Sequence, residues 1–529
     1  NNEINILNNG KQDGYIIKYN SGKQVEWYKN IGGDQNDSVT NIIETTDGGF
    51  IAFGTLGSDE IILEEGFTLK DGDRFLIKYS SNGNIIWAQT LERIVSYSII
   101  PTIDGGMVLG GHFSGRVNLN NGTSFYSSST DGIVIKYDSL GKVEWGKQIR
   151  GSNVDEIKRI TQISDGSIIV GGEFASKQIY LDNFVIENVN YAHGYSDAFL
   201  AKYKINGELE WTKQVAGSNS DSINSIQPTN DGGMIIGASL DYAGIRLENG
   251  EYVSASTGII IKADSDGNFK WAKKLNGNNN RLENIYNIIQ TKDEGYILSG
   301  RFSSNINLGD DVKLNAPTYE GSSDTCQMIV KYDKEGKTIW AIPLSGMSIN
   351  DIDITTNNTI LVAGYSKQDT IYSEDEISIV NNGNYDGIIL NVSEYTGVPE
   401  VQELTVENTR RQFKITTDVK EVDGIKGGNI SGEDDNPYET VKYGESNTKE
   451  IIMTPDENYE VIGITVNGQE WQFVENADGT YTMPQFTNVT EDKNIEVTYA
   501  LKDNKLIINK VDSKTQEPLL GATFKLDQI

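Results

Sequence analysis

The stretch from Asp131 to Trp145, DGIVIKYDSLGKVEW, constrains the fold most strongly, because close copies of it recur along three quarters of the chain. The other copies start at Asp13, Asp73, Asp197, Thr257, Thr325 and Asp386. Six of the seven lead to a tryptophan, and these tryptophans recur about every sixty residues. Self-similarity at such a period predicts a repeat architecture whose core grows by adding units.

One unit reads as four short strands. Its inner half is SVTNIIETT from Ser38, an Asp-Gly-Gly turn and FIAFG from Phe50. After a variable hairpin with an INL-type strand come DRFLIKY, an Asn-Gly turn and IIWAQTL. Asp-Gly and Asn-Gly supply the positive φ angles that short hairpins need, and period-two alternation of Ile, Val, Phe and Tyr is typical of strands. Helical periodicity of useful length is absent.

This pattern predicts an all-β fold, a β-propeller of four-stranded blades over residues 1–397, because radial closure protects the sheet edges. The repeated tryptophan is interpreted as packing between blades. Seven DGxIIKY strands but six inner hairpins can be counted, so seven blades are favoured and six remain the alternative. The unit also resembles bacterial propeller families with DGxxxKYDxxGxxxW repeats, and that resemblance implies the fold rather than a function.

Composition changes at Val398, and residues 398–502 again alternate with Asn-Gly and Asp-Gly turns, at the size of one small β-sandwich. The run from TPDENYEV through ITVNG to FTNVTEDKNIEVTY resembles a bacterial surface repeat. That resemblance implies a spacer module of a cell-surface protein.

Residues 503–529 include KLIINKVDSKTQEPLLGATFKLDQI, which is similar to the opening of the collagen-adhesin B-type, prealbumin-like modules of Gram-positive adhesins and pilins. In that family a first-strand lysine condenses with a late asparagine to form an isopeptide bond, and Lys510 is the matching residue. Burial that lowers the pKa of a lysine frees its amine for such an attack. An ordinary strand lysine remains the alternative, since the sequence ends at Ile529, ahead of the strands that would supply the partner.

The formal net charge is −31, and no stretch gathers lysine and arginine as a phosphate-binding surface would. We therefore expect neither nucleic acid nor an anionic membrane as partner, and no apolar run is long enough to span a bilayer. The single cysteine, Cys326, excludes an internal disulfide framework and is interpreted as a core residue.

The sequence offers candidates for a metal site, a catalytic site and a ligand-binding surface. Asp264, Asp266 and Asn268 place oxygen ligands at alternate positions beside a glycine, as in calcium loops. Other copies, such as YDSLGKVEW, lack the second acid, and a hairpin turn explains all of the copies at once. No cofactor is otherwise expected. The two histidines, His112 and His193, lie in different units with no triad spacing, so we do not expect an enzyme.

The most variable insertions carry tyrosine and asparagine, which suit stacking and hydrogen bonding against sugars or protein loops. Decorative outer hairpins are the alternative. The candidate ligand-loop residues are Tyr180, Tyr191, His193, Tyr195 and Tyr319.

Together these features predict an extracellular adhesin or pilus component of the cell wall. A propeller head on a β-sandwich stalk would bind a host or environmental glycan, glycoprotein or matrix protein, alongside other pilus subunits. Two alternatives stay open. One is a secreted carbohydrate-active hydrolase with a carboxylate pair in the propeller, and the other is a structural filament subunit.

Overall fold

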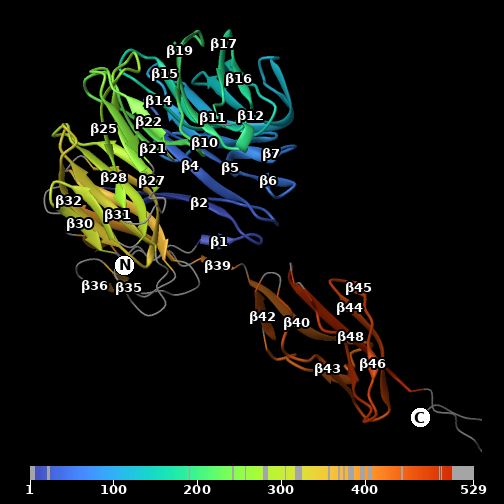
Figure 1. Ribbon diagram of the computed structural model, residues 1–529. Helices are drawn as coiled ribbons and strands as arrows, with labels where there is room; N and C mark the ends of the chain where they lie inside the picture. The colour runs from blue at the N-terminus through green and yellow to red at the C-terminus, as the bar shows by residue number, and fades with distance from the viewer. Residues whose placement is uncertain are drawn as a thin grey trace, which may run out of the picture. The chain divides into compact units, whose positions relative to one another are not determined.

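Strands make up nearly all the regular structure that the computed structural model describes (Figure 1). The described residues are 6–20, 24–189, 191–240, 243–255, 258–277, 284–303, 305–315, 325–355, 358–366, 370–372, 376–378, 386–393, 399–402, 408–410, 412–435, 437–442, 445–487, 489 and 491–502. The chain forms two compact units, Asn1–Thr409 and Arg410–Ile529.

The first unit contains six four-stranded antiparallel sheets, each joining an inner hairpin to an outer one. We call these sheets the second to seventh blades. The second blade is β4 (Ser38–Glu44), β5 (Phe50–Thr55), β8 (Arg74–Tyr79) and β9 (Ile85–Leu91). The third is β10 (Ile94–Pro101), β11 (Met107–Asn118), β12 (Ser124–Tyr137) and β13 (Val143–Ile149). The fourth is β14 (Asp155–Gln162), β15 (Ile168–Phe174), β18 (Asp197–Tyr203) and β19 (Leu209–Val215).

The remaining complete blades repeat this order. The fifth is β20 (Ser222–Pro228), β21 (Met234–Ser239), β24 (Gly258–Ala263) and β25 (Phe269–Lys274). The sixth is β27 (Asn284–Gln290), β28 (Tyr296–Ser303), β31 (Thr325–Tyr332) and β32 (Thr338–Leu344). The seventh is β33 (Met347–Ile354), β34 (Thr359–Ser366), β37 (Asp386–Ser393) and β38 (Pro399–Gln402). The prediction of four-stranded propeller blades is confirmed.

The first blade differs, because in the described residues it consists of the outer pair alone, β2 (Gly14–Tyr19) and β3 (Val25–Ile31). The count from the sequence, seven outer pairs and six inner hairpins, is therefore what the structure contains. Short β1 (Ile6–Asn8) pairs with β39 (Asn408–Arg410). Strand β38 adds the outer strand of the seventh blade, so the first unit extends past the predicted boundary at residue 397.

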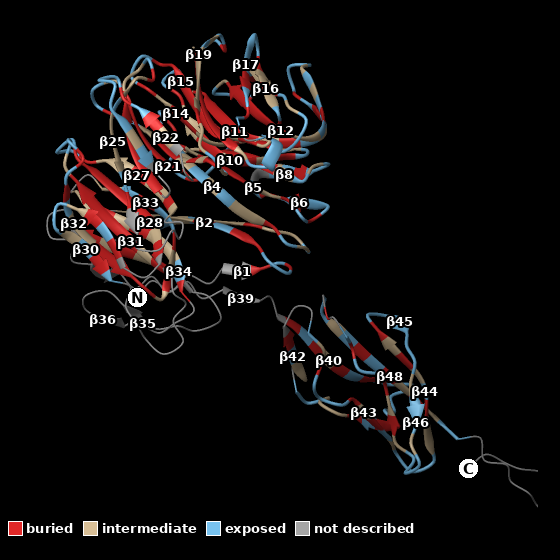
Figure 2. Ribbon diagram, in the orientation of Figure 1, coloured by how far each residue is buried: buried red, intermediate tan, exposed pale blue. Residues whose placement is uncertain are grey.

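Additional hairpins connect the second and third strands of most blades. They are β6 (Glu60–Ile62) with η1 (Glu64–Gly66) and β7 (Thr68–Lys70), β16 (Gln178–Leu181) with β17 (Phe184–Glu187), β22 (Ala243–Arg246) with β23 (Tyr252–Ala255), β29 (Asn305–Gly309) with β30 (Val312–Asn315) and β26 (Asn276–Gly277), and β35 (Thr370–Tyr372) with β36 (Glu376–Ser378). In the third blade the long strands β11 and β12 form this hairpin themselves. The INL-type residues are buried, as Val117 with Leu119 and Ile179 with Leu181 show, so these hairpins extend the blade cores (Figure 2).

The recurring tryptophans pack between consecutive blades, as predicted. Five of the rings each lie against the glycine of the outer turn of the following blade, where an added Cβ would meet the indole at about 3 Å. They are those of Trp27, Trp87, Trp145, Trp211 and Trp271. The indole N–H groups also donate to carbonyl oxygens of those turns, Trp27 to Ser81 at 3.1 Å, Trp87 to Ser139 at 3.2 Å and Trp145 to Ile205 at 2.9 Å. A single residue type thus supplies both packing and a polar link at these blade junctions.

We expect Gly141→Ala to destabilise the head by about 2 to 4 kcal/mol, because Gly141 has φ +77° and its Cβ would lie 3.1 Å from the Trp87 ring. Gly122→Ala is the matched control, since Gly122 has φ +87° but no heavy atom within 4 Å of an added Cβ. Urea unfolding of both variants isolates the tryptophan contact. Equal losses would show that the ring can move aside.

A buried lysine in the third strand of each of the second to sixth blades locks the inner turn. The carboxylate of the turn aspartate accepts a hydrogen bond from the lysine ammonium. Backbone N–H groups of the same turn donate to the same carboxylate. The ion pairs are Lys78 with Asp47 at 2.7 Å, Lys136 with Asp104 at 3.0 Å, Lys202 with Asp165 at 2.9 Å, Lys262 with Asp231 at 2.8 Å and Lys331 with Asp293 at 2.8 Å. For Asp104, burial alone would raise the pKa, but hydrogen bonds from Thr102 and Lys136 lower it overall.

Buried aspartates stand just before, or at the start of, several innermost strands. The Asp37 carboxylate accepts the N–H groups of Gly33 at 2.9 Å, Gly57 at 2.9 Å and Ser58 at 3.1 Å, and the Ser58 hydroxyl at 2.6 Å. Asp155 accepts the Ser176 N–H at 3.1 Å and its hydroxyl at 2.7 Å. These carboxylates fasten the loop between blades to the second connection of the same blade.

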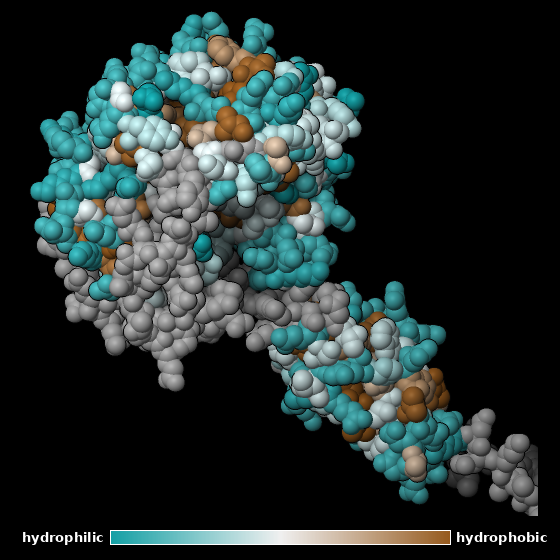
Figure 3. All heavy atoms as spheres, viewed as in Figure 1, coloured by the Kyte–Doolittle hydropathy of each residue, from teal (hydrophilic) through white to brown (hydrophobic). Residues whose placement is uncertain are grey.

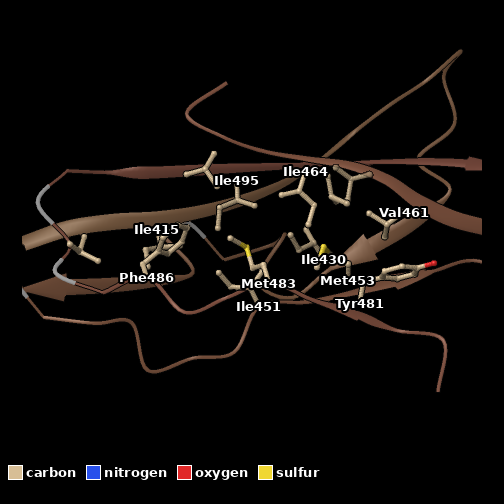
Figure 4. Packing of buried hydrophobic residues seen from close by; sticks show 14 of the residues in the cluster. Ile415, Ile430, Ile451, Met453, Val461, Ile464, Tyr481, Met483, Phe486 and Ile495 are labelled. Carbon is tan, nitrogen blue, oxygen red and sulfur yellow. The ribbon is translucent and has the colours of Figure 1, made fainter. Parts of the chain in front are cut away.

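The second unit packs a five-stranded sheet on a four-stranded one. The first sheet runs β42 (Glu439–Lys442), β40 (Gln412–Lys420), β48 (Lys493–Leu501), β44 (Tyr459–Val466) and β45 (Gln469–Glu470). The second runs β41 (Gly428–Ile430), β43 (Ile452–Pro455), β47 (Tyr481–Thr482) and β46 (Val474–Glu475). Their apolar faces share one core in which Ile415, Met453, Ile464 and Ile495 point toward one another (Figure 4).

Among the described ranges no helix is long and apolar enough to cross a membrane. Lys510 and the whole of residues 503–529 lie outside the described residues, so the isopeptide bond stays a prediction. Cys326 is buried in β31, in agreement with its interpretation as a core residue.

Candidate ligand-binding surface

The insertion of the fourth blade carries most of the predicted ligand-loop residues. Strands β16 and β17 form a hairpin whose Ile179, Leu181 and Ile186 side chains are buried in the blade core. Tyr180 faces the third blade, where its backbone exchanges N–H···O=C bonds of 3.1 and 2.9 Å with Arg150. The Arg150 guanidinium also lies 5.1 Å from the Tyr180 ring centre, so this tyrosine holds the hairpin on the neighbouring blade.

The base of the loop after β17 is fixed by two buried polar side chains. Asn188 donates through Nδ2 to the carbonyl oxygens of Phe174 at 3.2 Å and Tyr195 at 2.8 Å. The Asp197 carboxylate accepts the Val189 N–H at 2.8 Å and the Gln214 amide at 2.7 Å. Burial raises the pKa of Asp197, and those hydrogen bonds partly oppose the shift. Side-chain hydrogen bonds thereby fix the loop at both ends.

Strand β17 and the loop that follows it expose large apolar side chains. We call residues 184–195 the aromatic loop. Its exposed members are Phe184, Val185, Val189, Tyr191 and Tyr195, with exposed fractions between 37 and 63%. Figure 3 shows hydrophobic residues gathered over the part of the head where Figure 1 places β16 and β17. Exposed apolar groups on a fixed loop mark a surface suited to a partner.

The structure brings three predicted residues together in this loop. Tyr191 and His193 lie in the short turn η2 (Tyr191–His193), and the His193 and Tyr195 ring centres are 6.3 Å apart. Tyr319 lies outside the described residues. Phe184, Val185 and Val189 are not among the predicted residues, although an apolar run in a variable insertion could have indicated them. The Asn188 anchor has no sequence signal, because it depends on carbonyls that only the fold brings close.

The calcium candidates form a hairpin turn. The Asp264 carboxylate accepts the N–H groups of Asp266 at 3.0 Å and Asn268 at 2.8 Å, and the Lys270 ammonium lies 2.9 Å away. Burial acts to raise the Asp264 pKa, but the Lys270 and Asn268 hydrogen bonds outweigh it and bring the pKa to about 2. In the described part of the chain no group of three or more His, Cys, Asp or Glu side chains comes together as a metal centre. The calcium hypothesis stays a prediction.

A titratable cluster occupies the junction of the third and fourth blades. His112 Nδ1 lies 3.3 Å from Glu156 Oε1, and the Lys158 ammonium pairs with both Glu156 and Glu173. Lys158 also lies 4.8 Å from the Tyr97 ring centre. Burial lowers the pKa of His112, and Glu156 partly opposes the shift. The two carboxylates share one ammonium, which is an ion network rather than the separated acid and base of a glycosidase.

A cavity of about 280 Å³ lies between the second and third blades. Its walls combine polar and apolar side chains. They include Asp71, Gln89, Glu92, Asn118, Asn120 and Tyr137. Gln89 and Asn120 are already bonded to the Gly141 carbonyl at 3.2 and 3.1 Å, so they fasten the hairpin of the third blade to the preceding blade.

Fold and site together define a β-propeller repeat protein joined to a β-sandwich module, with a group of exposed aromatic and aliphatic residues on the insertion of the fourth blade. No family model matches the chain. It is 21% identical over 477 residues to an uncharacterized WD repeat-containing protein, L264, of Acanthamoeba polyphaga mimivirus. The match covers 74% of this chain and 34% of that protein, so the chain spans about a third of the length of this relative.

Solved structures are also similar. The WD40 domain of Neurospora crassa Pan2 has a TM-score of 0.36 at 9% identity, covering 68% of this chain and 83% of that domain. A Bacteroides caccae protein of unknown function has a TM-score of 0.32 at 8% identity, covering 63% and 94%. Similarities of this size carry no functional argument.

Proposed function

We propose that the chain is a non-enzymatic, extracellular adhesin or pilus component whose propeller head binds a glycan, glycoprotein or matrix protein. The observation that carries the proposal is the aromatic loop, which holds exposed apolar side chains on a base fixed by Asn188 and Asp197. Tyrosine rings can stack on sugar faces or pack against protein loops while their hydroxyls hydrogen-bond. The surface-repeat resemblance of residues 398–502 supports the extracellular location.

Weak contacts suffice for such a protein. Many copies on one surface raise the effective concentration of the second binding event, so avidity exceeds single-site affinity. The net charge of −31 of the whole chain disfavours nonspecific association with other acidic surfaces.

We expect the full chain to bind selected spots of a glycan and matrix-protein array, and Tyr191→Ala with Tyr195→Ala to weaken that binding about tenfold or more. Tyr126→Ala is the matched control, since Tyr126 is 61% exposed on the third-blade hairpin. Circular dichroism checks that all variants are folded. Binding that survives the double variant, or that Tyr126→Ala removes equally, would place the ligand elsewhere and contradict the proposal.

A further inference from the structure

The edge of β2 differs from the edge of the corresponding strand in every complete blade. In the fourth blade β18 pairs with β15 on one side and β19 on the other. Among the described residues β2 pairs along its length with β3 alone, and it packs beside β4 of the second blade (Figure 1). The backbone groups on its other edge therefore have the geometry to accept one more antiparallel strand.

Lys18 of β2 makes one of the two ion pairs that the equivalent lysines of the third and fourth blades make. In the third and fourth blades the corresponding lysine pairs with the turn aspartate of the inner hairpin and with the glutamate before the tryptophan, as Lys136 does with Asp104 and Glu144. Lys18 keeps the second contact, with Glu26 at 2.8 Å, and its ammonium also donates to the Ser81 carbonyl oxygen at 3.1 Å. The first blade has no inner hairpin among the described residues, so no turn aspartate is described beside Lys18.

Burial shows the same difference. The Lys18 side chain is 29% exposed, whereas those of the counterparts in the second to sixth blades are at most 7% exposed. A tyrosine follows the lysine in most of these strands. Tyr79, Tyr137 and Tyr203 are almost fully buried, whereas Tyr19 is only partly buried. The surface left open therefore combines a strand edge, a cation and aromatic rings.

We infer that the β2 edge is a docking site for a separate β-hairpin of the inner type, whose Thr-x-Asp turn places its carboxylate on Lys18. The complementary charge and the unpaired edge together select this partner over a single apolar strand. In the sixth blade the Lys331 ammonium shows the contact to be reproduced, 2.8 Å from Asp293 and 2.6 Å from the Thr291 hydroxyl. Strand addition of this kind takes its affinity from backbone hydrogen bonds and its specificity from side-chain pockets.

The test uses the full chain and a synthetic peptide of residues 284–301, NIYNIIQTKDEGYILSGR, which is the inner hairpin of the sixth blade. We expect saturable binding by fluorescence anisotropy. Hydrogen exchange of the Gly14–Tyr19 segment should slow on binding, while that of Asp197–Tyr203, already paired on both edges, should not change.

A double-mutant cycle identifies the ion pair. Lys18→Met in the chain and Asp293→Asn in the peptide should each weaken binding about tenfold, and together no more than either alone. Lys29→Met is the control, because Lys29 lies on β3 and pairs with Glu64. Lys18→Arg should retain most of the affinity.

Three outcomes would overturn the inference. The first is protection of Gly14–Tyr19 in the chain alone equal to that of Asp197–Tyr203, which would mean that the edge is already covered. The second is a dimer in sedimentation that protects β2 without peptide, which would make a second copy the occupant. The third is additive effects of Lys18→Met and Asp293→Asn, which would place the turn away from Lys18.

Discussion

Replacing Asp37 with alanine is expected to lower the free energy of unfolding of the head by about 3 to 5 kcal/mol. The carboxylate is buried and accepts four hydrogen bonds, from Gly33, Gly57 and both groups of Ser58. Its removal leaves those donors in a site closed to water, and each unsatisfied buried donor is costly. Urea unfolding followed by tryptophan fluorescence measures the loss.

The control for this experiment is Asp59→Ala, because Asp59 is exposed in the same loop as Ser58. Its effect should stay within about 0.5 kcal/mol. Asp37→Asn should fall between the two, since its amide oxygen can accept the N–H bonds of Gly57 and Ser58, but its NH₂ group faces the Gly33 N–H, which can only donate. A loss below about 1 kcal/mol for Asp37→Ala would show that the loop rearranges to satisfy its donors.

The head is also expected to become less stable as the pH rises from about 4 to 8. Burial raises the pKa of Asp155 to about 7, against an ordinary value of 3.8, and the nearby Asp131 adds to the shift. The folded state therefore binds a proton that the unfolded state releases. The stabilisation is complete below pH 3.8 and is lost as the pH rises through 7, on the order of 4 kcal/mol if Asp155 acted alone.

Unfolding in urea at intervals across this range measures the slope. Burial also raises the pKa of Asp13 and Asp197, so these groups contribute with the same sign. Asp264 is an opposite case, but its pKa of about 2 places its effect below the window. Burial lowers the pKa of His112, so this group partly opposes the loss of stability within the window. Asp155→Asn should flatten the slope while lowering stability at every pH, because its amide hydrogens meet the Ser176 hydroxyl. A stability that rises with pH would contradict the assignment.

The sequence predicts the blades well because their signals are local and repeated. Asp-Gly turns, period-two alternation and a tryptophan at fixed spacing each correspond to one structural feature, and the Trp87 contact with Gly141 confirms the interpretation of the tryptophan. The seven outer pairs and six inner hairpins can be counted in the sequence itself. The boundary was less certain, since Pro399–Gln402 lacks the repeat pattern and becomes a strand through pairing with β37.

The candidate site was predicted in part. Tyrosines in a variable insertion pointed to Tyr191 and Tyr195, but nothing in the sequence shows that Asn188 would be buried beneath them. The pairs of buried lysine and turn aspartate have a signal in the sequence, because a Thr-x-Asp turn and the lysine of the IIKY strand recur in the same units. Pairing them requires the strand order, which places residues about thirty apart side by side.

The tryptophan link also gives the head a direction of assembly. The indole of Trp27 donates to the turn at Ser81, and that of Trp87 donates to the turn at Ser139. Each of these contacts therefore needs residues that leave the ribosome later than the tryptophan. The indole N–H groups of Trp27, Trp87 and Trp145 are thus satisfied only after the outer turn of the following blade has been synthesised.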